Sequence, residues 1–311
     1  MIRLGELSKF RSELMGTAMA FIMASHTIGR FAPYGNIGVE WFLILSGVGL
    51  FFSLSKDYNV KRFYKKRFRR IVPTYLLVSI PFFLIAFPFN LKQFLIRISG
   101  LNLAFYWERY FWFIPMILLC YLIAPFYFKF ISRYRYSSLF PFVLAIVIFF
   151  ISFHTPRTQI MITRFPIFLL GMHLGQAVYE DKTIFNCKPQ WLSFLIPALA
   201  MICVVAINYV PHLIEVERQV YFLCGIPSLL FILSIVKYLV KVKPVQRLLA
   251  LMGEISLELF LVHPCIVLPI CLKIPLPKII DVVISYIVAI IVAYALHAFM
   301  SIILIRKNER I

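Results

Sequence analysis

The sequence contains few acidic residues and little charge overall. Of its 311 residues only 14% are charged, and 13 Asp and Glu stand against 32 Lys and Arg. Hydrophobic residues make up 62% of the chain, and no long hydrophilic stretch separates them. A water-soluble protein of this length cannot bury so much apolar surface. The composition therefore excludes an ordinary soluble domain and indicates a protein that crosses the membrane several times.

Strict alternation of polar and apolar residues, which is typical of a membrane β-barrel, is also missing. The apolar residues form continuous runs of about twenty residues instead, and such runs cross lipid as helices. We expect an all-α membrane protein in one domain over residues 1–311, a bundle of about ten transmembrane helices with a central cavity. The expected spans are residues 12–30, 37–55, 71–89, 110–130, 138–154, 163–179, 191–210, 219–240, 247–271 and 279–305.

Cysteine pairs at the spacing of a metal site or a redox motif are absent as well. None of the six cysteines belongs to a CxxC pair, and most of them lie inside apolar runs. Thiols in such surroundings behave as small core residues. We therefore expect neither a disulfide nor a bound metal.

The positive charge lies mostly in short segments between the apolar runs. With both termini in the cytoplasm, most of the 32 Lys and Arg fall on the inner side, as the positive-inside rule requires. Membrane topology and contact with anionic lipid account for these residues, so we expect the lipid bilayer, and no nucleic acid, as a partner. The sequence thus predicts a multi-pass protein of the cytoplasmic (inner) membrane. Its densest basic run, VKRFYKKRFRRIVPTY, covers residues 60–75.

Several ionisable residues fall at one depth inside the predicted bundle. His26 lies fifteen residues beyond Arg11, or about 22 Å at the helical rise, which places it in the outer half of the bilayer. Glu40 on the second span lies at a similar depth, and His263 reaches the same level on a later span. Arg164 opens an inward-running span from the outer side. Apolar packing alone does not require such a polar layer.

Structural explanations exist for the same residues. A histidine within a span is also compatible with a core position bonded to a backbone carbonyl, and Glu40 is also compatible with an interfacial carboxylate that faces water. Ionisable groups within spans are usually functional, however. A neutral imidazole is well suited to accept a proton near neutral pH. We therefore treat His26 as a candidate general base.

Six short motifs follow one another along the chain. They are the Gly16 to His26 helix, GVEWFLILSG, FYKKRFRRIVPTY, FWFIPMILLCYLIAP, RFPIFLLG and GEISLELFLVH. Together they resemble the acyltransferase-3 family of membrane acyltransferases, and the resemblance covers most of the chain. It implies an enzyme that transfers an acetyl group, usually from acetyl-CoA, to a hydroxyl of an envelope or exported polysaccharide.

The resemblance and the chemistry of acyl transfer suggest a role for each candidate residue. We expect His26 to take the proton from the acceptor hydroxyl and Glu40 to orient His26. Arg67 and Arg70 share a helical face and are expected to bind the phosphates of acetyl-CoA at the cytoplasmic edge. The pantetheine arm then carries the thioester to His26. The residues expected to contact substrate are Trp112, Tyr121, Arg164, Glu258 and His263.

One position departs from the family pattern. Many relatives carry an arginine eleven residues before the histidine, where this chain has Met15. Arg11 lies one helical turn earlier, and we expect it to take the place of that arginine.

A different class of protein also fits these features. A transporter of a glycan precursor or small anion has many spans and charges near the membrane midplane. A sensor or scaffold derived from the family is a third interpretation. A transporter places polar groups at successive depths along broken helices, whereas a transferase concentrates them at one depth.

Overall fold

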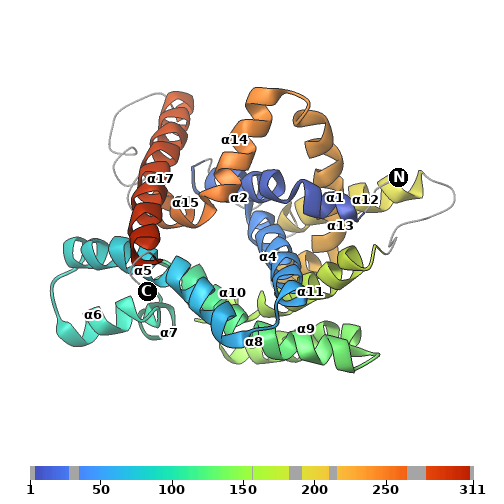
Figure 1. Ribbon diagram of the computed structural model, residues 1–311, viewed down its shortest axis with the longest axis horizontal. Coiled ribbons are helices and arrows are strands. Elements are labelled where there is room, and N and C mark those ends of the chain that lie inside the picture. The colour runs from blue at the N-terminus through green and yellow to red at the C-terminus, as the bar shows by residue number, and fades with distance from the viewer. Residues whose placement is uncertain are drawn as a thin grey trace.

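The computed structural model describes residues 4–27, 35–155, 157–181, 191–209, 216–264 and 278–308. Within these residues every regular element is a helix, and many of the helices are long and apolar (Figure 1). The all-α membrane architecture expected from the sequence is confirmed.

Eight described helical segments are long and apolar enough to cross a membrane, and each corresponds to one expected span. They are α4 (Ile37–Lys56), α5 (Val60–Ala86), α8 (Phe113–Arg133), η2 (Ser137–Leu139) with α9 (Phe140–His154), α10 (Gln159–Ile162) with α11 (Phe165–Tyr179), α12 (Leu192–Ala206) with η3 (Ile207–Tyr209), α13 (Glu217–Leu239) and α17 (Lys278–Asn308). The other described helices are α1 (Gly5–Lys9), α2 (Arg11–Thr27), α6 (Leu91–Ile98), α7 (Asn102–Tyr106), α14 (Lys243–Glu254) and α15 (Ser256–Val262).

The two remaining expected spans extend beyond the described residues. The span expected over 12–30 corresponds to α2, and the span expected over 247–271 corresponds to α14 and α15, which meet at Ile255. The expected single helix over 247–271 is therefore two helices in its described part. The total of ten spans stays a prediction.

The basic run is helical, so the span expected to begin at residue 71 belongs to a helix that already begins at Val60. Asn59 caps the first turn of α5, because its side chain accepts a hydrogen bond from the Arg62 amide at 2.9 Å. Lysine and arginine are good helix formers, so the helix passes through the run and continues into the apolar segment. The cations consequently lie on a regular surface that is continuous with a membrane span.

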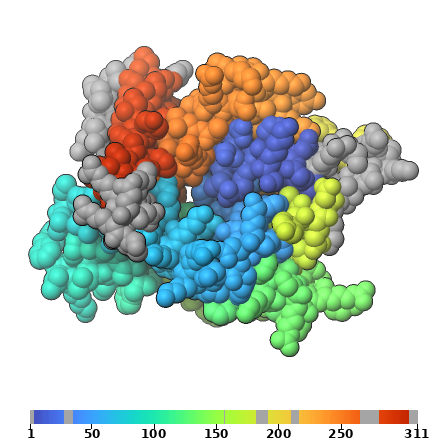
Figure 2. All heavy atoms as spheres, in the orientation of Figure 1, coloured from blue at the N-terminus to red at the C-terminus, as the bar shows by residue number. Residues whose placement is uncertain are grey.

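Helices α2 and α4 lie near the middle of the molecule, and α14 packs along α2 (Figures 1 and 2). Glycines allow α4 and α11 to approach each other closely. A Cβ atom on Gly47 of α4 would lie 2.6 Å from the Phe168 carbonyl oxygen of α11, and one on Gly171 would lie 2.6 Å from the Ile44 carbonyl oxygen. Small residues at such crossings are typical of helix packing in membranes. The same face of α4 therefore rests directly on α11.

We predict that Gly47→Ala destabilises the protein by about 1–3 kcal/mol, because the added methyl group pushes α4 away from α11. Thermal unfolding of the purified protein in detergent measures this change. Gly5→Ala is the matched control, since a Cβ atom there meets no atom within 4 Å. Equal melting temperatures for the two variants would contradict the close approach of α4 and α11.

Candidate functional site

A cavity of about 420 Å³ runs between helices α2, α4, α5, α8, α14 and α15. Its charged side chains are Arg11, Arg67, Arg70 and Glu254. Along α2 the lining extends from Arg11 to Ile22, eleven residues apart and therefore about 16 Å at the helical rise. The part of the cavity beside Ile22 is mostly apolar, and the rings lining it are Phe42, Phe113 and Phe260. The cavity thus has a cationic end and an aromatic end.

A second hollow, of about 580 Å³, adjoins the cationic end of the cavity. Its cations all come from the first turns of α5 and are Arg62, Lys65, Lys66, Arg67, Arg69 and Arg70. This basic groove shares Arg67, Arg70, Ile71 and Tyr121 with the cavity. Because the two hollows share these four residues, the basic groove lies directly beside the cationic end of the cavity.

Arg67 stands at the junction of the basic groove and the cavity. Its guanidinium carbon lies 5.6 Å from the centre of the Phe63 ring and 5.7 Å from that of Tyr121. Its buried Nε has no hydrogen-bond partner among the described residues. Arginine combines ring stacking with five N–H donors, so Arg67 has donors available for an anion.

Arg70 at the same junction is paired with the buried carboxylate of Glu258. Its NH1 and NH2 groups donate to Oε1 and Oε2 of Glu258 at 2.5 and 2.9 Å. The Nδ1 atom of His297, on α17, lies 3.2 Å from both Arg70 NH2 and Glu258 Oε1. Glu258 is fully buried. Two predicted site residues, Arg70 and Glu258, therefore meet, and His297 joins them.

Arg11 and Met15 both line the cavity. The Nε of Arg11 donates to the Leu45 carbonyl oxygen at 3.1 Å, and a Cβ atom on Gly49 would lie 2.5 Å from its NH2. A side chain at position 49 would therefore displace the guanidinium. Arg11 and Arg67 line the same cavity although they lie on different helices.

His26 and His263 contact each other one helical turn beyond the aromatic end of the cavity. The Nε2 atom of His263 lies 3.1 Å from Nδ1 of His26, and the same His26 Nδ1 lies 2.9 Å from the Ile22 carbonyl oxygen. His263 is buried, and its Nδ1 lies 2.8 Å from the Leu259 carbonyl oxygen. Since Ile22 also lines the cavity, the histidine pair lies next to its aromatic end.

These contacts assign the hydrogen positions in the neutral histidine pair. A backbone carbonyl only accepts, so His263 carries its hydrogen on Nδ1, and its Nε2 is an acceptor. Nδ1 of His26 then faces two acceptors, the Ile22 carbonyl and His263 Nε2, and must carry the hydrogen itself. The lone pair of His26 is left on Nε2. His26 Nε2 is thus the basic nitrogen, and the ring retains exposed surface in the described structure.

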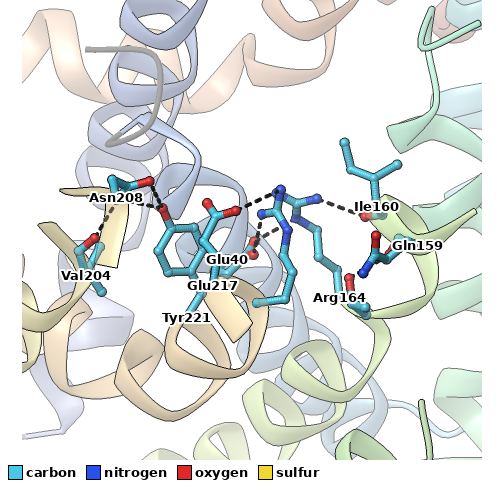
Figure 3. Close-up of polar contacts among 10 residues, drawn as sticks. Glu40, Gln159, Ile160, Arg164, Val204, Asn208, Glu217 and Tyr221 are labelled. Carbon is cyan, nitrogen blue, oxygen red and sulfur yellow. Dashed lines mark hydrogen bonds and ion pairs between the residues drawn. The ribbon is translucent and has the colours of Figure 1, made fainter. Parts of the chain in front are cut away.

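Glu40 belongs to a second, separate polar cluster (Figure 3). Its Oε2 accepts from Arg164 Nε at 3.0 Å, and its Oε1 lies 3.6 Å from Arg218 NH1. Arg164 also donates to the Ile160 carbonyl oxygen, and its guanidinium carbon lies 5.0 Å from the centre of a Trp112 ring. Glu40 lies on the face of α4 that rests on α11, whereas Phe42 lines the cavity. Glu40 therefore lies with Arg164 and Trp112. No hydrogen bond or ion pair among the described residues joins this cluster to His26 or His263.

The structure thus places the nine predicted site residues in four groups. These are His26 with His263, Arg67 with Tyr121, Arg70 with Glu258, and Glu40 with Arg164 and Trp112. Arg218 was not among the residues predicted from the sequence, and His297, which carries no motif, was predicted to be structural. Both are ionisable residues within or at the edge of an apolar run, and that signal was available in the sequence.

No cluster of three or more metal-binding side chains occurs among the described residues. Cys120, Cys203 and Cys224 are free thiols, while Cys187, Cys265 and Cys271 lie outside the part of the chain that the structure describes.

We predict that Glu40→Leu lowers the free energy of unfolding by about 3–5 kcal/mol, because it leaves the buried guanidinium of Arg164 without its counter-charge. Thermal unfolding in detergent measures the loss. Glu180→Gln is the control, since Glu180 is an exposed carboxylate and its replacement should change stability by less than about 0.5 kcal/mol. A Glu40→Leu protein as stable as the control would contradict the importance of this ion pair.

A family model described as an acyltransferase domain matches residues 15–298. The match includes the histidine pair, the basic groove and the Glu40 cluster, and it leaves out Arg11. No curated protein and no solved structure matches the chain.

Proposed function

The chain belongs to the acyltransferase-3 family and is a membrane acyltransferase, and we propose that it is an O-acetyltransferase of an envelope or exported polysaccharide with acetyl-CoA as donor. One observation carries this proposal. One cavity has a basic groove beside one end and, beside the other, a histidine pair in which His26 Nε2 is the basic nitrogen. A two-substrate transfer requires both an anion site for the donor and a base for the acceptor.

The basic groove suits the phosphate groups of coenzyme A. Phosphates bind well to several guanidinium and ammonium groups that face one hollow. In this proposal Arg67 marks the inner limit of the phosphate site, Arg70 stands just beyond it in its pair with Glu258, and Tyr121 packs beside the start of the pantetheine arm. The groove faces the cytoplasm, where acetyl-CoA is made, and both termini lie on that side of the inner membrane.

The cavity suits the pantetheine arm, which is long, narrow and uncharged. Its length along α2, about 16 Å, carries a thioester from one membrane surface to about the middle of the hydrocarbon core, one helical turn short of His26. Ser12, Ser46 and Ser256 line it and offer hydroxyl partners for the amides of the arm. The acetyl group then lies at the aromatic end, beside His26.

In the proposed reaction His26 Nε2 takes the proton of the acceptor hydroxyl as its oxygen attacks the thioester carbonyl. A bond forms between the acceptor oxygen and the acyl carbon, and the carbon–sulfur bond then breaks. The departing thiolate receives the proton from the imidazolium of His26. His263 accepts the hydrogen bond from His26 Nδ1 throughout, so it holds the tautomer and orientation that the reaction needs.

Glu40, Arg164 and Trp112 are proposed to serve the acceptor rather than the donor. Arg164 offers guanidinium donors for hydroxyl groups, and the Trp112 ring 5.0 Å away offers an apolar face for a sugar ring. The hydrogen bonds of Glu40 support a role in holding Arg164, whereas the contact of His263 supports that residue as the partner of His26. The transporter considered from the sequence has no support in the family to which the chain belongs.

We predict that His26→Gln abolishes acetyl transfer in the purified protein, while the dissociation constant of acetyl-CoA changes by less than about threefold, because the phosphate site lies at the other end of the cavity. Binding of labelled donor and release of free coenzyme A measure the two effects. His173→Gln is the control, since His173 contacts Tyr127 and Ser137 outside the cavity. Full transfer by His26→Gln would exclude His26 as the base.

A second prediction separates the two candidate partners of His26. His263→Gln should lower kcat by about 10–100-fold with an unchanged KM for the donor, because the His26 ring loses its oriented acceptor. Glu40→Gln, assayed in its folded fraction, should keep a larger share of kcat. The opposite order of the two kcat values would favour Glu40 as the orienting residue.

A further inference from the structure

Three arginines stand at the cationic end of the cavity, and they differ in how their charge is balanced. Arg11 bonds a backbone carbonyl, and Arg67 lies against two aromatic rings. Neither has an ion pair with a carboxylate among the described residues. Arg70 alone of the three makes a two-fold contact with a carboxylate, that of Glu258. The charges of Arg11 and Arg67 are therefore available to an anion, and that of Arg70 is largely cancelled.

Because Glu258 is buried, its carboxylate cancels most of the charge of Arg70. The Glu258 side chain is 0% exposed and that of Arg70 is 34% exposed, so water screens the pair little from the carboxylate side. Both oxygens of Glu258 are engaged by Arg70. His297 contacts both partners through one nitrogen, which donates to Glu258 in one tautomer and accepts from Arg70 in the other.

We propose that Glu258 is a positioning residue for the donor: it neutralises Arg70, so that the phosphates stop at Arg67 and the uncharged arm passes Arg70 into the cavity. This inference rests on the proposed function. Arg70 lies three residues beyond Arg67, about 4.5 Å further along α5. An uncompensated charge on Arg70 would draw the phosphates inward by that distance. The thioester would then be displaced from its position beside His26.

Glu258→Gln tests the inference, because it removes the counter-charge and keeps the shape of the side chain. We expect the full-length protein in detergent to bind adenosine 3′,5′-bisphosphate about fivefold more tightly, since one more positive charge faces the phosphates. We expect kcat to fall about tenfold, because the acyl group is displaced from the base. The double variant Glu258→Gln with Arg70→Gln should return the affinity to within about twofold of the original protein. A purely structural role for Glu258 would leave the affinity unchanged or weaken it.

Two further variants complete the test. Glu13→Gln removes the same charge from a buried carboxylate that does not line the cavity and should leave the affinity unchanged. Arg67→Gln should weaken binding of the bisphosphate much more than the double variant Arg70→Gln with Glu258→Gln, which removes both charges of the pair, and this comparison holds even if Glu258→Gln alone does not fold. Equal losses for Arg67→Gln and the double variant, or unchanged or weaker binding by folded Glu258→Gln, would overturn the inference. If the original protein binds neither the bisphosphate nor acetyl-CoA, the proposed function itself fails.

Discussion

The interior of this protein depends on one constraint, which is that an ionised group among hydrocarbon needs a partner. Glu40 and Arg164 are both almost fully buried and bond each other, and Glu258 takes its counter-charge from Arg70. Each pair joins helices that are far apart in the sequence. The ion pairs therefore fix the relative placement of helices that apolar packing alone would leave free to slide or rotate.

The sequence allowed the depth of the polar residues to be predicted, because depth follows from counting residues along a helix. His26 and His263, assigned to the same level, are in contact in the structure. The direction of each side chain around its helix was harder to predict. Glu40 has the same level assigned to it, yet it lies on the face of α4 that packs on α11 and bonds Arg164. The ion pairs and the close glycine contacts between helices set this rotation together, and neither can be read from a single span.

The helical extent of the basic run was missed for a related reason. A dense row of cations between two apolar runs suggests a loop, because loops carry the topological charges of membrane proteins. Lysine and arginine also favour helix, however, and Asn59 supplies the cap that starts one. As a result the basic groove is built on the same helix as the membrane span.

Arg11 has a consequence for how related proteins are recognised. It lines the cavity together with Met15, one turn further along α2, because both residues belong to one stripe of that helix. A long guanidinium side chain can start from either level and still reach the same space. A sequence motif that requires arginine at one fixed distance before the histidine would therefore not match this chain. A motif that accepts arginine at either of two positions one helical turn apart would match it.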